Sequence, residues 1–162
     1  MLLLLLLSLT LAPPLTLKDL QSFTFALGET SSVEGGKVPL LDGKWTDREG
    51  GSSFTLLPLH AIGDLDGDGS ADAAAILVES SGGTGSFYYL FAIMNRDGKP
   101  VQAGEPEWLG DRTDVQRLTI DDKGIIAVRM LTHKDSDASC CPTLRIDDRY
   151  RVKAGKLIGI TK

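Results

Sequence analysis

Residues 72–78 read DAAAILV, a near-continuous apolar run with little polar alternation. A strand with one wet face alternates apolar and polar residues, whereas a strand covered on both faces does not. We therefore predict that this run is a central strand of a sheet, with other parts of the protein packed on both of its faces.

Outward from this run, short apolar segments are separated by turn signals. Asp42-Gly43 and Asp97-Gly98 each lie between apolar or alternating runs, which is a strong hairpin signal. In Leu144–Val152 the apolar residues all lie at even-numbered positions, so the other face of that strand is expected to be exposed to solvent. Strands are expected at residues 37–41, 44–47, 54–62, 72–79, 86–95, 106–109, 114–120, 124–132, 143–152 and 156–161.

These segments predict an all-β fold with a minor helix near the N-terminus, around Leu17–Phe25. Short turns without intervening helices indicate a mostly antiparallel sheet, arranged as a sandwich or a partly open barrel. The chain has 162 residues, which suits a single domain. Its net charge of −5 and the absence of a basic cluster with interleaved aromatic residues argue against a nucleic-acid partner.

The first residues contain a leucine-rich run, Leu2–Ala12, that is too short to span a bilayer and has the length of a signal-peptide core. We interpret residues 1–16 as a signal peptide and residues 17–162 as one β-rich calcium-binding domain. The alternative is an N-terminal helix that belongs to the fold. An exported chain would be secreted or periplasmic, with no stable membrane span after removal of the signal.

Residues 64–72 read DLDGDGSAD and place acidic residues at alternate positions. Calcium takes six to eight oxygen ligands, and glycine at the sixth position permits the sharp turn that brings them together. We predict a Ca²⁺ site in which Ser70 offers its backbone carbonyl and the other ligands are the side chains of Asp64, Asp66, Asp68 and Asp72. The alternative is a solvated acidic turn without metal.

The loop departs from an EF-hand, because Ala75 stands at the twelfth position in place of the bidentate glutamate. It resembles instead the shorter loop of integrin-like FG-GAP repeats, which implies a site held between two β-strands. A single copy is present, so a propeller is excluded. We expect affinity in the extracellular range, about 10⁻⁴–10⁻³ M, and a structural role for the ion.

Cys140 and Cys141 are adjacent and are the only cysteines of the chain. In an oxidising compartment they can form a vicinal disulfide, remain thiols, or bridge to another molecule. Among other residues, Trp45 and Trp108 are expected in the core, with a ligand face as the alternative. No catalytic motif such as Gly-x-Ser-x-Gly is present.

Five segments follow one another along the chain: GDLDGDG (63–69), DAAAIL (72–77), GGTGSFYYL (82–90), LGDR (109–112) and CCPT (140–143). Their order and spacing resemble a group of small exported bacterial proteins of unknown function. The resemblance covers about residues 37–161 and implies no known activity.

The leading hypothesis is a non-enzymatic binding or structural module of the cell envelope, stabilised by calcium, whose partner is an unknown protein or envelope ligand. One alternative is an inhibitor of a secreted or cell-wall enzyme, acting through a loop such as 133–143. The other is a calcium-dependent hydrolase with carboxylates drawn from Asp111, Asp114, Asp135 and Asp137.

Overall fold

Most of the chain forms β-strands in the computed structural model, which describes residues 12–28, 33–47 and 51–160. The only α-helix of this part is α1 (Leu17–Gln21), and a short 3₁₀ turn, η1, covers Glu34–Gly36. The strands are β1 (Thr24–Ala26), β2 (Lys37–Pro39), β3 (Lys44–Thr46), β4 (Ser53–Gly63), β5 (Asp72–Ser80), β6 (Phe87–Arg96), β7 (Lys99–Gln102), β8 (Glu107–Asp111), β9 (Asp114–Ile120), β10 (Ile126–Thr132), β11 (Leu144–Lys153) and β12 (Lys156–Gly159).

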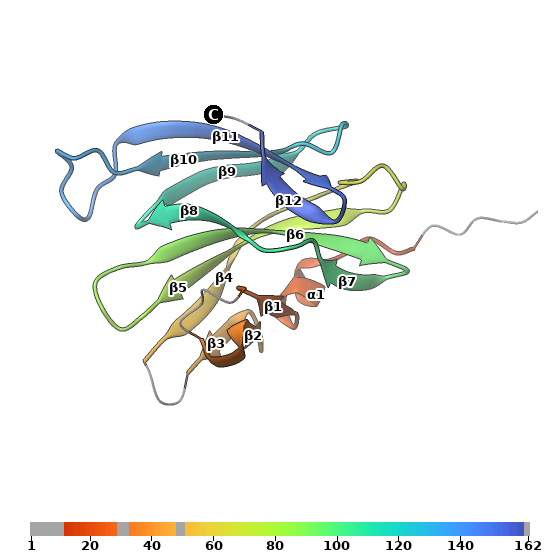
Figure 1. Ribbon diagram of the computed structural model, residues 1–162, viewed down its shortest axis with the longest axis horizontal. Helices are drawn as coiled ribbons and strands as arrows, with labels where there is room; N and C mark the ends of the chain where they lie inside the picture. The colour runs from red at the N-terminus through yellow and green to blue at the C-terminus, as the bar shows by residue number, and fades with distance from the viewer. Residues whose placement is uncertain (1–11, 29–32, 48–50, 161–162) are drawn as a thin grey trace, which may run out of the picture.

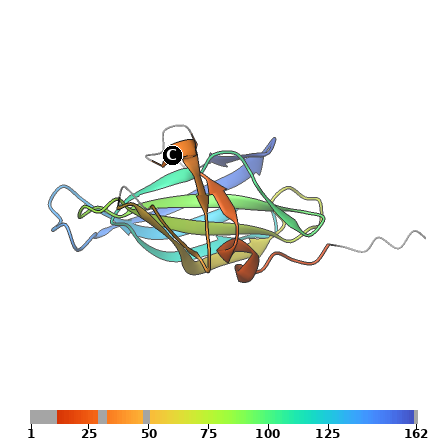
Figure 2. The same ribbon diagram turned by 90° about the horizontal axis from the view of Figure 1, so that it is seen from below.

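The strands are arranged in layers (Figure 1). The central six-stranded sheet has the order β3-β4-β5-β6-β7, and β8 also pairs with β6. A four-stranded sheet, β12-β11-β10-β9, packs on one face of it, and the N-terminal segment with α1, β1 and β2 covers the other face (Figures 1 and 2). Every pairing is antiparallel, which confirms the predicted all-β, sandwich-like fold with a minor N-terminal helix.

Strand β5 is covered on both faces, as its apolar run predicts. Ala74 and Ile76 pack toward the four-stranded sheet, whereas Ala73, Ala75 and Leu77 pack toward the N-terminal layer. All five side chains are fully buried. Burial on both faces removes the need for polar alternation, which explains the unusual composition of this strand.

The hairpin between β6 and β7 turns at Asp97-Gly98, where both residues have positive φ (55° and 81°). This conformation matches the right-handed twist of the paired strands and is the reason that Asp-Gly predicts a hairpin. The turn at Asp42-Gly43 has the same conformation, but it joins residues that share only one bridge, Leu41 with Lys44.

Two expected elements are shorter than predicted, and two strands, β1 and β7, were not expected. The helix ends at Gln21, and residues 24–26 form β1, which pairs with β2. The strand expected over 37–41 is therefore shorter and has β1 as its partner. No strand was expected at β7 although Asp97-Gly98 predicted a hairpin there, and Pro100 lacks the N–H that an inner strand donates. As the end strand of the order β3-β4-β5-β6-β7, β7 tolerates this proline.

The predicted signal core lies largely in residues 1–11, outside the described part of the chain. Residues 13–16, which the prediction grouped with the signal, pack on the domain. Leu15 is buried, and the side chain of Thr16 accepts a hydrogen bond from the Asp19 N–H while the Asp19 carboxylate accepts one from the Thr16 N–H. Among the described residues, no helix is long and apolar enough to cross a membrane.

Candidate metal centre

The acidic loop connects the end of β4 to the start of β5. Gly63 and Asp72, which pair with each other across the two strands, lie at either side of the loop. Strands thus flank the loop on both sides, as its sequence predicted. Because an antiparallel pair holds its two ends at a fixed separation, the first and last acidic residues of the motif, Asp64 and Asp72, are brought to the same end of the sheet.

Three of the four predicted aspartate ligands converge. One carboxylate oxygen from each of Asp64, Asp66 and Asp72 lies within 4.8 Å of the other two. They differ in environment, since Asp72 is buried, Asp64 is partly buried and Asp66 is exposed. Carboxylate oxygens are the ligands that hard cations prefer, so this group could hold a metal ion.

Asp72 anchors the group to the sheet. One of its carboxylate oxygens accepts the N–H of Leu65 (2.8 Å), and the other accepts the N–H of Asn95 (2.7 Å). Burial raises the pKa of Asp72, and the neighbouring charges of Asp66 and Asp68 act in the same direction. A cation beside this carboxylate would offset both effects.

Backbone hydrogen bonds curl the rest of the loop. Asp64 accepts the N–H groups of Gly67 (2.7 Å) and Gly69 (2.9 Å) on its two oxygens. Gly67 and Gly69 have φ of 82° and 84°, a conformation open to glycine and costly for other residues. The glycines of the motif therefore shape the turn that gathers the carboxylates.

Asp68 and Ser70 are joined by a hydrogen bond within the loop. Asp68 is not part of the converging group: one oxygen accepts the Ser70 N–H (2.7 Å), and this bond lowers the pKa of Asp68. Its other oxygen accepts a hydrogen bond from Arg96 (2.7 Å). In this structure Asp68 is thus part of the turn and of an ion pair.

Sequence reasoning missed two residues at the end of β6. The guanidinium of Arg96 forms ion pairs with Asp66 (2.6 Å) and Asp68 (2.7 Å). The side chain of Asn95 is buried and donates to the carbonyls of Pro13 (2.7 Å) and Ala71 (3.2 Å). The only available signal was a polar pair following the apolar strand, just before the Asp97-Gly98 turn.

A groove of about 670 Å³ runs beside the loop. One wall is formed by residues 64–67 and Arg96, and the others by the turn at 122–125 and the hairpin at 151–155. Gly124 packs against the loop so closely that a Cβ atom there would lie 2.8 Å from the Asp64 carbonyl oxygen. The four-stranded sheet therefore supports the loop from outside the hairpin that carries it.

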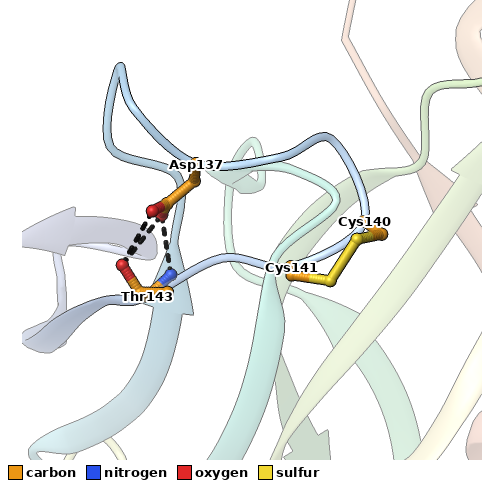
Figure 3. Close-up of a disulfide and its surroundings, with 4 residues drawn as sticks. All are labelled: Asp137, Cys140, Cys141 and Thr143. Atoms are coloured by element: carbon orange, nitrogen blue, oxygen red, sulfur yellow. Dashed lines mark hydrogen bonds between the residues drawn. A yellow bond between two sulfur atoms is a disulfide. The ribbon is translucent and has the colours of Figure 1, made fainter.

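A disulfide joins Cys140 and Cys141 in the loop between β10 and β11, which confirms the vicinal bridge over its alternatives (Figure 3). Asp137 closes the same loop by accepting the N–H groups of Lys134 (3.0 Å) and Thr143 (2.8 Å). It also accepts the Thr143 hydroxyl (2.9 Å). The disulfide and this cap together give the loop a defined shape.

The remaining candidates have local roles. Asp111 accepts the Ser86 N–H (2.9 Å) and pairs with Arg112 (2.6 Å). Asp114 accepts a hydrogen bond from Gln116 (3.3 Å). Trp45 packs against Phe54, but Trp108 is 62% exposed, so the expectation of a core position for Trp108 is wrong.

Comparisons with known proteins find no match to this chain. No protein family model matches the chain, and no curated protein or solved structure is similar to it.

Proposed function

We propose that this chain is an exported binding or structural module of the cell envelope, stabilised by one calcium ion at the loop between β4 and β5. The observation that carries the proposal is the convergence of Asp64, Asp66 and Asp72 within 4.8 Å at the end of the central hairpin. The leucine-rich N-terminal run supports export.

The donor set favours calcium over transition metals. All three converging side chains are carboxylates, and no histidine or cysteine is among them. Zinc and copper sites use nitrogen and sulfur ligands, whereas calcium takes oxygens in flexible geometry. Magnesium demands near-ideal octahedral geometry, which a loop with unevenly buried carboxylates is less suited to provide.

The ion would act on stability. Three carboxylates held this close repel one another. Of these three, only Asp66 forms an ion pair with Arg96, whose other ion pair is with Asp68. A cation among the three would relieve the repulsion and fix the hairpin end. Since Ala75 replaces the bidentate glutamate of an EF-hand, the site suits calcium concentrations found outside cells.

Thermal and urea unfolding in calcium and in chelator test the proposal. Calcium at roughly 100 times its Kd is expected to raise the free energy of unfolding by about 3 kcal/mol. Asp64→Asn and Asp66→Asn should abolish most of this increase, and Asp135→Asn, in the distant loop 133–143, serves as the matched control. A melting temperature that does not respond to calcium, or that responds equally in Asp64→Asn, would contradict the proposal.

A further inference from the structure

The outer face of the four-stranded sheet is rich in arginine. Leu118, Val128 and Tyr150 represent its inner face, which packs on the central sheet. Because side chains alternate along a strand, the intervening residues point outward. They include five of the eight arginines of the chain: Arg117, Arg129, Arg145, Arg149 and Arg151.

This face, which we call the arginine face, has a net positive charge in an acidic protein. Lys153 and Lys156 add two cations at its end, and Asp114, Asp121 and Asp147 are acidic residues beside the cations of this face. Asp148 also lines the hollow on this face, and Glu105 and Glu107 lie beside Lys156, so the seven cations still outnumber these six carboxylates. The whole chain carries a net charge of −5. No other described element lies over this sheet on its outer side (Figure 1).

The cations of the arginine face are only partly neutralised. Asp147 pairs with both Arg129 (2.6 Å) and Arg145 (3.2 Å). Within the described residues, Arg117 and Arg151 form no ion pair. Arg117 also lies directly opposite Arg129 across the strand pair, an arrangement of like charges that is unfavourable unless an anion lies nearby.

A hollow of about 330 Å³ lies in the middle of this face. The small side chain of Ala127 is paired with Thr119 on one side and with Arg149 on the other. Arg117, Arg129 and Asp147 also line the hollow. It thus offers guanidinium donors together with a hydroxyl and a carboxylate acceptor.

We propose that the arginine face binds an acidic polysaccharide whose sugar units carry carboxylate or sulfate groups. Guanidinium groups match such anions with paired hydrogen bonds, and the acceptors in the hollow suit sugar hydroxyls. A single-stranded nucleic acid would need aromatic side chains for base stacking, and none is among the outward residues of these strands.

Binding of the folded protein to heparin and to polygalacturonate, with neutral dextran as the control polymer, tests this proposal. The variant Arg117→Gln/Arg149→Gln/Arg151→Gln is expected to bind about tenfold more weakly or worse, and wild-type binding should weaken as salt rises. Lys37→Gln/Lys44→Gln/Lys99→Gln removes three exposed cations from other strands and should bind like the wild type. Arg117→Gln alone, which breaks no ion pair, should show part of the loss even if the triple variant unfolds.

The proposal would be overturned by no binding to either acidic polymer, equal binding to dextran, equal losses in the two triple variants, or tighter binding to single-stranded DNA or phosphatidylglycerol vesicles. The measurements are repeated in chelator, under conditions in which circular dichroism shows that the protein is still folded. Retained binding there supports the assignment to the sheet face, and its disappearance would contradict it. The hollow around Arg117 and Arg129 shares no lining residue with the groove beside the acidic loop, whereas Arg151 and Lys153 line that groove. The result for Arg117→Gln alone is therefore the one that is independent of the calcium proposal.

Discussion

The guanidinium of Arg96 neutralises part of the negative charge of the acidic loop. It pairs with Asp66 and Asp68, and only the first of these belongs to the converging group. A calcium ion that used either carboxylate would compete with Arg96 for its oxygens. We therefore interpret Arg96 as a tethered counter-ion that weakens metal binding while it stabilises the metal-free loop.

Arg96→Gln should therefore tighten calcium binding about three- to tenfold, because an exposed charge at this distance contributes on the order of 1 kcal/mol. The same change should lower the stability of the protein in chelator. Isothermal titration gives the first quantity and urea unfolding the second. Lys99→Gln is the matched control, since Lys99 is the exposed cross-strand partner of Arg96. Weaker calcium binding in Arg96→Gln would show that the arginine supports the site, and unchanged binding would show that it does not compete with the ion.

At the scale of elements, the acidic loop depends on a turn that belongs to another sheet. Gly124 has φ of 71°, and a Cβ atom there would lie 2.8 Å from the carbonyl oxygen of Asp64 and 3.0 Å from that of Leu65. Gly155 has nearly the same φ, 72°, but a Cβ atom there would meet nothing within 4 Å. Comparing substitutions at the two glycines therefore distinguishes the effect of backbone strain from the effect of contact with the loop.

Gly155→Ala should cost about 1–2 kcal/mol of stability from backbone strain alone and should leave calcium binding unchanged. Gly124→Ala should cost more and should also weaken calcium binding, because the added methyl group displaces the backbone at Asp64. Urea unfolding and calcium titration of both variants measure the two effects. Equal stability and equal calcium affinity in the two variants would mean that the turn at 122–125 does not position the loop.

The elements that could be predicted are those whose signal is local. A local pattern predicted a buried strand at β5 and a hairpin turn after β6. The alternation in β11 likewise predicted that one face of this strand is exposed to solvent. The acidic loop was likewise visible, because its ligands are spaced within nine residues. By contrast, β1 forms only through its pairing with β2, and the first two of its residues, 24 and 25, were assigned to the helix.

Features that arise from pairing between distant strands could not be predicted. Arg96 lies 28 residues from Asp68 in the sequence. The register of β5 with β6 brings the end of β6, where Arg96 lies, next to the loop. The arginine face requires the registers that place Arg117, Arg129 and Asp147 side by side across three strands. The sequence predicted a wet face on β11 but not which neighbours it would have.

At the scale of the whole molecule, residues 13–16 connect the N-terminal layer to the central sheet and the acidic loop. Leu15 is buried in the core beneath the central sheet, and its N–H donates to the Ala71 carbonyl (3.4 Å). The Pro13 carbonyl accepts from Asn95, whose own N–H donates to Asp72. This part of the chain thus reaches the candidate metal centre through one asparagine.

A chain that begins at Leu17 should therefore be less stable than one that begins at Pro13, each with an added initiator methionine. Loss of the buried Leu15 side chain costs about 2–3 kcal/mol and loss of the Thr16 cap about 1 kcal/mol. Together these are a large share of the 5–15 kcal/mol typical of a domain. Urea unfolding of both chains measures the difference, and Leu15→Ala in the longer chain should reproduce most of it. Equal stability would show that residues 13–16 do not stabilise the domain, whereas the expected loss would show that they are part of its fold.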